Sequence, residues 1–290
     1  SVAVGASALA TQNAGADAYN VAVGYNAGTA VTTGVQNTLI GGEAGDALTD
    51  ADYNVAIGYL ALSGDTLGSR SVAIGRSALQ VQNFTSATNA YNVAIGFQCG
   101  DSVTTGVQNT LIGGLSGDDI TTGDNNVTVG YASLSKATTA DNNTAVGRGA
   151  LSEATTGAGN TGVGKGALEY NTTASNNTAV GLDALYANTT GFDNVAVGAT
   201  ALDANTSGNG NTAVGYGSLG SDTLGDRAVA IGKNALAAQN FTSTTDNYNI
   251  GIGYDAGLNV TTGTLNTLIG GLSGDAITTG VANVIVGYQA

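Results

Sequence analysis

Four amino acid types are missing from this 290-residue sequence: proline, tryptophan, histidine and methionine. Without histidine, the usual nucleophile systems that pair serine or cysteine with histidine cannot form. The single cysteine, Cys99, excludes a disulfide framework or a cysteine-based zinc site within one chain. We therefore expect a protein that is not an enzyme and that has no catalytic residues, no cofactor and no metal.

Charge is also scarce, at 10% of residues, with 7 basic against 21 acidic side chains and a net charge of −14. Nucleic acid binding needs clustered lysine and arginine, so we expect no nucleic acid partner. No run of 18 apolar residues is present, and we expect no membrane insertion. The first residues lack the basic segment of a signal peptide. The chain begins and ends inside a repeat, so we expect a segment of a longer fibre.

What the sequence has in abundance is glycine, with 46 residues, arranged in a short repeat. An invariant glycine follows four residues after an anchor position, which is usually asparagine. The anchors are Ser1, Asn20, Asn37, Asn54, Ser71, Asn92, Asn109, Asn126, Asn143, Asn160, Asn177, Asn194, Asn211, Ala228, Asn249, Asn266 and Asn283. They lie 17 residues apart in thirteen cases, 21 in two and 19 in one. Such a period is typical of stacked repeat proteins.

Residues around each invariant glycine alternate in type. The first and third positions after the anchor are Val, Ile or Thr, as at Val55 and Ile57, and the position between them is usually Ala or Gly. This alternation predicts a short strand whose β-branched face is buried, with Val stacked on Val in successive coils. The invariant glycine indicates a bend with positive φ or a close backbone approach. The glycines assigned this structural role are Gly24, Gly58, Gly147, Gly181 and Gly215.

The rest of each repeat predicts a second short strand followed by a polar turn. The seventh position after the anchor is Ala, Ser or Cys, the eighth is Leu or Gly, and many repeats end in Thr-Thr-Gly. We predict an all-β parallel β-solenoid, or β-roll, of about 17 coils with a dominant 17-residue repeat. Residues 1–290 form a single repeat array in which 54–133 and 211–290 are duplicated blocks.

The phrases SVAVG at 1–5 and SVAIG at 71–75 resemble the head repeats of trimeric autotransporter adhesins. The longer phrase NTAVGLDALYANTTGFDNVAVG at 177–198 resembles repeats of phage tail fibres. The resemblance implies a homotrimer and an extracellular fibre. We predict a segment of a phage tail fibre or virion appendage that spaces or presents receptor-binding elements for host attachment. The alternative is the head of a bacterial trimeric surface adhesin.

Small residues at the second position after the anchor, such as Ala145 and Ala179, allow two interpretations. They could let the strand approach another chain, or they could fit a narrow coil interior.

The position directly after the invariant glycine, named here the corner column, is the main candidate for surface contact. It holds seven aromatic residues and four of the seven cations. Such side chains could stack on a cell-surface glycan or bind a protein receptor; the alternative is that they cover the solenoid edge. The candidate residues are Tyr25, Tyr59, Arg76, Phe97, Tyr131, Arg148, Lys165, Tyr216, Lys233 and Tyr254.

Other chemistry is less well supported by the sequence. Asp46, Asp118, Asp119 and Asp275 lie in turns, where capping of backbone amides is favoured over calcium binding. Glutamates are scattered over separate coils, which argues against the paired carboxylates of a glycosidase. An ice-binding solenoid would need a regular threonine array, which is interrupted here.

Overall fold

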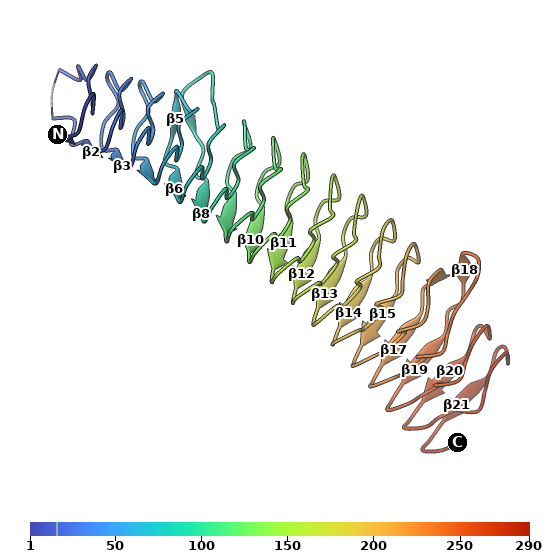
Figure 1. Cartoon of the computed structure of the whole chain (residues 1–290). Coiled ribbons are helices and arrows are strands. Elements are labelled where there is room, and N and C mark those ends of the chain that lie inside the picture. The colour runs from blue at the N-terminus through green and yellow to red at the C-terminus, as the bar shows by residue number, and fades with distance from the viewer. Residues whose placement is uncertain (16) are drawn as a thin grey trace. The chain divides into compact units, whose positions relative to one another are not determined.

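The computed structural model describes residues 1–15 and 17–290, which fall into two compact units, Ser1–Asn143 and Thr144–Ala290. The same coil recurs in both units, and each unit is described by itself. Together they comprise about 17 turns of a parallel β-solenoid (Figure 1). The predicted fold class is thus confirmed. The described part of the chain has no helix suited to crossing a bilayer.

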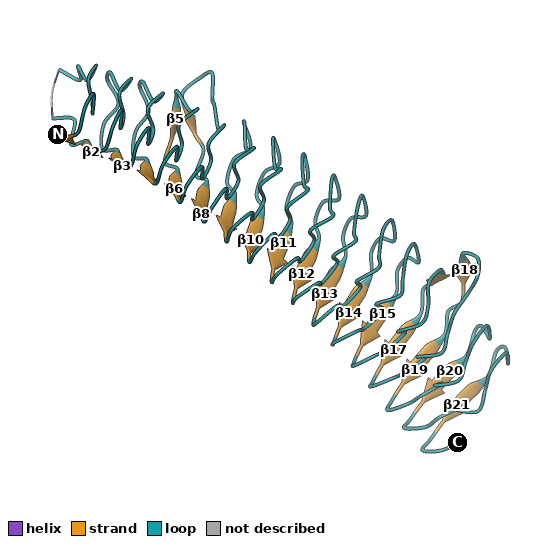
Figure 2. Cartoon of the chain, in the orientation of Figure 1, coloured by secondary structure: helices purple, strands orange, loops and turns teal. Residues whose placement is uncertain are grey.

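Each coil contributes one three-residue strand, and within each unit these strands lie along one side of the stack while the rest of the coil is loop and turn (Figure 2). The strands of the first unit are β1 (Val2–Val4), β2 (Val21–Val23), β3 (Thr38–Ile40), β4 (Val55–Ile57), β6 (Val72–Ile74), β8 (Val93–Ile95), β9 (Thr110–Ile112) and β10 (Val127–Val129). Those of the second are β11 (Thr144–Val146), β12 (Thr161–Val163), β13 (Thr178–Val180), β14 (Val195–Val197), β15 (Thr212–Val214), β17 (Val229–Ile231), β19 (Ile250–Ile252), β20 (Thr267–Ile269) and β21 (Val284–Val286).

Neighbouring strands within a unit pair in parallel and in register. In β13 and β14, for example, Ala179 lies opposite Ala196 and Val180 opposite Val197. Each of the two 21-residue coils forms a longer loop with a two-residue strand that pairs with one in the preceding coil. These pairs are β5 (Gly68–Ser69) with β7 (Thr88–Asn89), and β16 (Gly225–Asp226) with β18 (Thr245–Asp246). Equivalent positions therefore form columns along each stack, as the repeat predicted.

The strand face that points inward differs from the prediction. The middle residue is buried in every three-residue strand except β1 and β21, whereas the β-branched residues on either side are half-buried or exposed. Ala179 is fully buried, while Val180 keeps 37% of its surface exposed. The expectation of a buried β-branched face was wrong, and the small middle residues instead fit the coil interior. A coil this narrow leaves space there only for a small side chain because leucines from the opposite wall fill it.

Leucine and glycine exchange places in this interior. Most coils have a buried leucine at the eighth position, such as Leu185, opposite a small strand residue such as Ala179. Coils that read NTLIGG instead place the leucine on the strand. Leu39 is one of these strand leucines. If Gly28 or Gly45 had a Cβ, that atom would lie only 2.5 Å or 2.8 Å, respectively, from a methyl group of Leu39. One leucine thus fills the space of two eighth-position residues, which explains the alternation of Leu and Gly.

The predicted second strand is absent from the described residues. In its place the backbone makes consecutive turns in which amides bond alternately within the coil and to a neighbouring coil. Ala27 N donates to Gly24 O in the same coil, whereas Gly28 N donates to Ala44 O in the next coil. Non-glycine residues adopt positive φ at the sixth and eighth positions, as at Asn26 (54°) and Leu185 (52°). The chain therefore packs as tight turns rather than as an extended second strand.

A ladder of buried asparagines connects the anchors of successive coils. The side chain of Asn177 is fully buried, and its Oδ1 accepts the backbone N–H of Asn194 at 3.0 Å. Its Nδ2 donates to Gly191 O at 2.8 Å and to Asn160 Oδ1 at 3.3 Å. Equivalent bonds to the next anchor N–H and to a carbonyl 14 residues ahead recur at most of the other asparagine anchors, as at Asn37 and Asn126, so each such amide satisfies buried polar groups of its own coil and of a neighbour.

In the two 21-residue coils, whose anchors are not asparagine, a glutamine supplies the missing side-chain acceptor of the ladder. Ser71 and Ala228 are the anchors of the two 21-residue coils. In the first of these coils, Gln82 Oε1 accepts the amide of Asn92 at 2.8 Å; in the second, Gln239 Oε1 accepts that of Asn249 at 2.8 Å. The duplicated blocks therefore share a compensating substitution at a buried site.

Each glutamine also contacts a buried carboxylate. Gln82 Nε2 donates to Asp65 at 2.6 Å, and Gln239 Nε2 donates to Asp222 at 2.5 Å. Burial raises the pKa of both carboxyls, while hydrogen bonds from the glutamine and from backbone amides oppose that shift. Asp65 also accepts the backbone N–H of Gly68 and of Phe84, so it fixes the base of the longer loop.

The five glycines assigned a structural role have the predicted backbone conformation. Their φ values lie between +131° and +144°, and a Cβ on any of them would collide with the carbonyl of the invariant glycine in the next coil. Positive φ and close backbone approach therefore both require glycine at this position.

Candidate contact surface

The corner column is exposed in both units. All ten predicted contact residues have exposed side chains, and Tyr59 keeps 49% of its surface accessible. Because the coils stack in register, residues of this column that are distant in sequence lie in successive layers of one unit. The structure therefore forms two surface rows, one per unit, but does not gather the ten residues into a single pocket.

Aromatic and cationic members of the corner column contact one another across neighbouring coils. Arg76 Cζ lies 5.5 Å from the centre of the Phe97 ring. Lys233 Nζ lies 6.0 Å from the centre of the Tyr216 ring and 5.8 Å from that of Tyr254. Such cation–π contacts orient the side chains while leaving part of each ring accessible.

A second row of tyrosines was missed by the sequence analysis. The residue directly before the anchor forms the pre-anchor column, which includes the exposed Tyr19, Tyr53, Tyr91 and Tyr248. Arg70 Cζ lies 4.6 Å from the Tyr53 ring centre and 5.9 Å from that of Tyr91, so it occupies the space between these rings. The signal was present in the sequence, since Tyr-Asn precedes the strand in four repeats.

Between these two columns runs the outward strand face of each unit. It consists of the β-branched first and third positions, which are half-buried or exposed and form a nearly uncharged stripe. Its first position is often threonine, whereas its third position is always Val or Ile, and a continuous apolar row of this kind is typical of an interaction surface.

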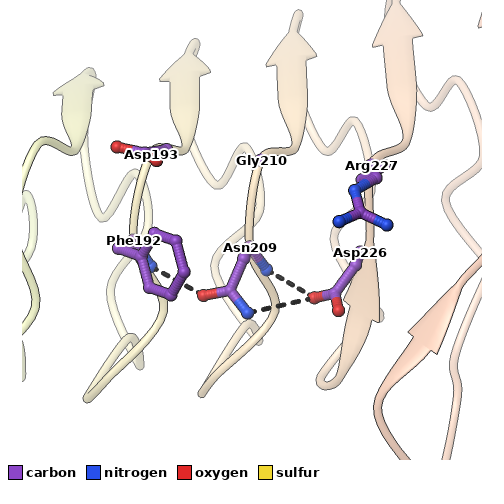
Figure 3. A pocket seen from close by; sticks show the side chains of 6 residues that line it. All are labelled: Phe192, Asp193, Asn209, Gly210, Asp226 and Arg227. Atoms are coloured by element: carbon purple, nitrogen blue, oxygen red, sulfur yellow. Dashed lines mark hydrogen bonds between the residues drawn. The ribbon is translucent and has the colours of Figure 1, made fainter.

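A small surface pocket of about 220 Å³ opens in the second unit (Figure 3). It is lined by Phe192, Asp193, Asn209, Gly210, Asp226 and Arg227. Phe192 N donates to Asn209 Oδ1 at 3.0 Å, and Asn209 N donates to Asp226 Oδ1 at 2.6 Å. Equivalent side-chain contacts support other coils, as where Asp52 accepts the N–H of Val35. The polar groups of the pocket are therefore engaged in joining coils, and Gly210 leaves the gap.

Cys99 lies at the seventh position and is fully buried, as predicted for a small core residue. Its Sγ contacts the carbonyl oxygen of Leu111 at 3.1 Å. Burial raises the pKa of the thiol to about 12, which keeps it protonated and unreactive in the folded chain.

The turn aspartates do not form a recognisable metal site. Among residues 1–15 and 17–290, no three acidic, histidine or cysteine side chains group as metal ligands would. Asp46 and Asp118 each have one carboxylate oxygen enclosed without a hydrogen-bond partner. Desolvation, together with the charges of Asp119 and Asp101, raises the pKa of Asp118 to about 6.

We expect Asp118→Asn to stabilise the first unit at neutral pH. The folded pKa of about 6 exceeds the ordinary aspartate pKa of 3.8, so ionisation costs stability as pH rises through this interval, and no cost remains below it. Because the carboxyl is partly solvated, the gain is about 1 kcal/mol at pH 7.5 and vanishes near pH 3.5. Urea unfolding at both pH values measures it. The exposed Asp50→Asn is the control, and an equal gain in both variants would contradict this origin.

No protein-family model matches the sequence, and no curated protein or solved structure is significantly similar to the chain. The resemblance to tail-fibre and adhesin repeats therefore remains a prediction.

Proposed function

We propose that the chain is a structural and adhesive segment of an extracellular fibre, a phage tail fibre or comparable virion appendage, that spaces or presents receptor-binding elements. The observation that carries this proposal is the repetition of one set of contacts from coil to coil. Strand amides, the anchor asparagines and the invariant glycines make equivalent contacts in successive coils of each unit. A fold built this way gains length by adding coils and needs no new core.

The role in host attachment is supported by the exposed corner column rather than by any pocket. The chain presents aromatic and cationic side chains in successive coils. The polar groups that line the small pocket of the second unit already bond to one another. Among described residues, nothing groups into the usual constellations of an enzyme site, and we propose a non-enzymatic role. The head of a bacterial trimeric adhesin is the alternative, favoured by the SVAIG phrase at 71–75.

Gold-labelled antibodies raised against the purified chain test the location. Applied to intact cells and to released phage particles of the source culture, they should decorate virion appendages under the electron microscope. Decoration of the cell surface alone would favour the adhesin. Label found only inside cells would contradict both.

We propose further that three copies associate through the outward strand face. Val180 and Val197 lie on this face and remain more than one-third exposed in the isolated chain, so burying them would contribute about 1 kcal/mol each. Light scattering should give three times the chain mass of 28.2 kDa. Val180→Lys with Val197→Lys should yield monomers, whereas the turn-tip control Thr190→Lys should not. A monomeric wild-type chain would contradict the trimer.

A further inference from the structure

The aromatic residues of the corner column in the first unit have a regular spacing. They occur in every second coil, at Tyr25, Tyr59, Phe97 and Tyr131, and the intervening coils carry Gly42, Arg76 and Gly114. Because adjacent strands are about 4.8 Å apart, equivalent aromatic residues recur about every 9.6 Å along the stack. The coil that carries Arg76 has 21 residues, whereas those that carry Gly42 and Gly114 have 17, and the alternation of aromatic residues is the same across all three.

The glycines in this row have a structural consequence. A Cβ at Gly42 would lie 3.4 Å from Cδ2 of Tyr59, and a Cβ at Gly114 would lie 3.7 Å from Cδ2 of Tyr131. Each tyrosine ring therefore leans over the preceding coil, where the absence of a side chain leaves it room. The rings are thus supported by backbone on one side and exposed on the other.

The second unit carries the same arrangement in its duplicated block, 211–290. Tyr216, Tyr254 and Tyr288 occupy alternate coils, with Lys233 and Gly271 between them. Cδ2 of Tyr288 would lie 3.5 Å from a Cβ at Gly271, so this ring leans over its glycine in the same way. Exposed rings held at this two-coil spacing along each row fit a ligand that has a matching repeat.

We infer that the corner column binds a linear β-1,4-linked polysaccharide of the cellulose or chitin type. In such a chain successive pyranose rings are turned over, so equivalent ring faces recur after two sugars, a distance similar to two coils. Exposed aromatic rings stack on the apolar C–H faces of sugars, which accounts for the need for aromatic side chains. Arg76 and Lys233, beside the rings, can donate hydrogen bonds to sugar hydroxyls. This inference rests on the proposed adhesive function and specifies its ligand.

The pre-anchor column provides a matched comparison. Tyr53 and Tyr91 flank the same strands, β4 and β8, as Tyr59 and Phe97 and are similarly exposed. Arg70 lies between their rings much as Arg76 lies between Tyr59 and Phe97, but Gln36 and Gln108 stand where the corner column has Gly42 and Gly114. That row therefore lacks the open glycine steps of the corner column. Replacing two aromatic residues in either row removes similar surface beside the same two strands.

Depletion from solution by insoluble polysaccharides tests the inference on the full chain. We expect microcrystalline cellulose or chitin to retain the wild-type chain, and α-1,4-linked amylose to retain none, because its helical chain lacks the two-residue repeat. Tyr59→Ala with Phe97→Ala should weaken retention at least tenfold. Tyr53→Ala with Tyr91→Ala should bind as wild type, and circular dichroism should be unchanged in both variants.

Three results would overturn the inference: no retention on cellulose or chitin, equal retention on amylose, or equal loss in the two double variants. A fall in solution mass for Tyr59→Ala with Phe97→Ala would also overturn it, because the row would then be a contact between copies of the chain. These outcomes are separate from the fibre proposal, since antibody labelling of virions requires no polysaccharide.

Discussion

Replacing Gly181 with alanine should lower the free energy of unfolding by about 4 kcal/mol, enough to unfold several coils. The glycine has φ of +141°, a conformation that residues with a side chain rarely adopt. Its Cβ would lie 2.5 Å from the carbonyl oxygen of Gly198 and 2.6 Å from the carbonyl carbon. Both atoms belong to the backbone of the next coil, so no side-chain rotation relieves the contact. Chemical unfolding followed by circular dichroism measures the loss.

Gly210→Ala is the matched control for this substitution. Its φ is +63°, and only Arg227 Cγ, at 3.8 Å, lies within 4 Å of the added Cβ. Asp193 and Arg227 occupy the same position in neighbouring coils with φ of 57° and 62°. The expected cost is therefore about 1 kcal/mol. Equal destabilisation by the two alanines would show that close coil stacking does not explain the invariant glycine.

Asn177→Ala should cost about 3 kcal/mol because it opens the buried ladder in the second unit. The substitution leaves the N–H and side-chain amide of Asn194 without their acceptor, and Gly191 O without its donor from residue 177. Buried groups that lose a partner cannot recover it from water. Urea unfolding and amide hydrogen exchange at Asn194 report the stability and the local opening.

The neighbouring Asn176→Gly controls for loss of an asparagine. Asn176 is exposed, has φ of 61°, and occupies a position where Gly159 and Gly210 are found in other coils. We expect a change below about 1 kcal/mol. A comparable loss in both variants would mean that the buried amide ladder adds little to the stability of the coil.

The sequence predicted the repeat, the parallel stack and the glycine bends because each follows from strict periodicity. It did not fix which strand face is buried. Ala179 and Val180 are both apolar, and a shift of one residue exchanges the two faces. Hydrophobicity alone favours valine inside, whereas the interior opposite Leu185 admits only a small residue. The volume available inside the coil decides which strand face is buried, and the order of residue types along the chain does not give that volume.

The buried asparagines were missed for a related reason. Asparagine is usually found at surfaces and in turns, so a recurring asparagine was interpreted as a marker of the repeat. Its burial depends on backbone groups that only a stacked coil brings together, such as Gly191 O and the N–H of Asn194 beside Asn177. The pre-anchor tyrosines escaped notice because Tyr53 and Tyr91 alternate with Arg70 and appear irregular when single repeats are compared.

The central claim is that each repeat forms one layer of an in-register stack. Pulsed electron resonance within the second unit tests it, with spin labels at the exposed turn positions Thr156, Thr190 and Thr262 in a Cys99→Ala chain diluted with unlabelled protein. Thr190 and Thr262 are four layers apart, and Thr156 and Thr262 six layers apart, so Cα separations of about 19 and 29 Å are expected. Labelled pairs should therefore differ by about 10 Å in mean distance. Equal distances, or distances that do not increase with the number of layers, would contradict the stack.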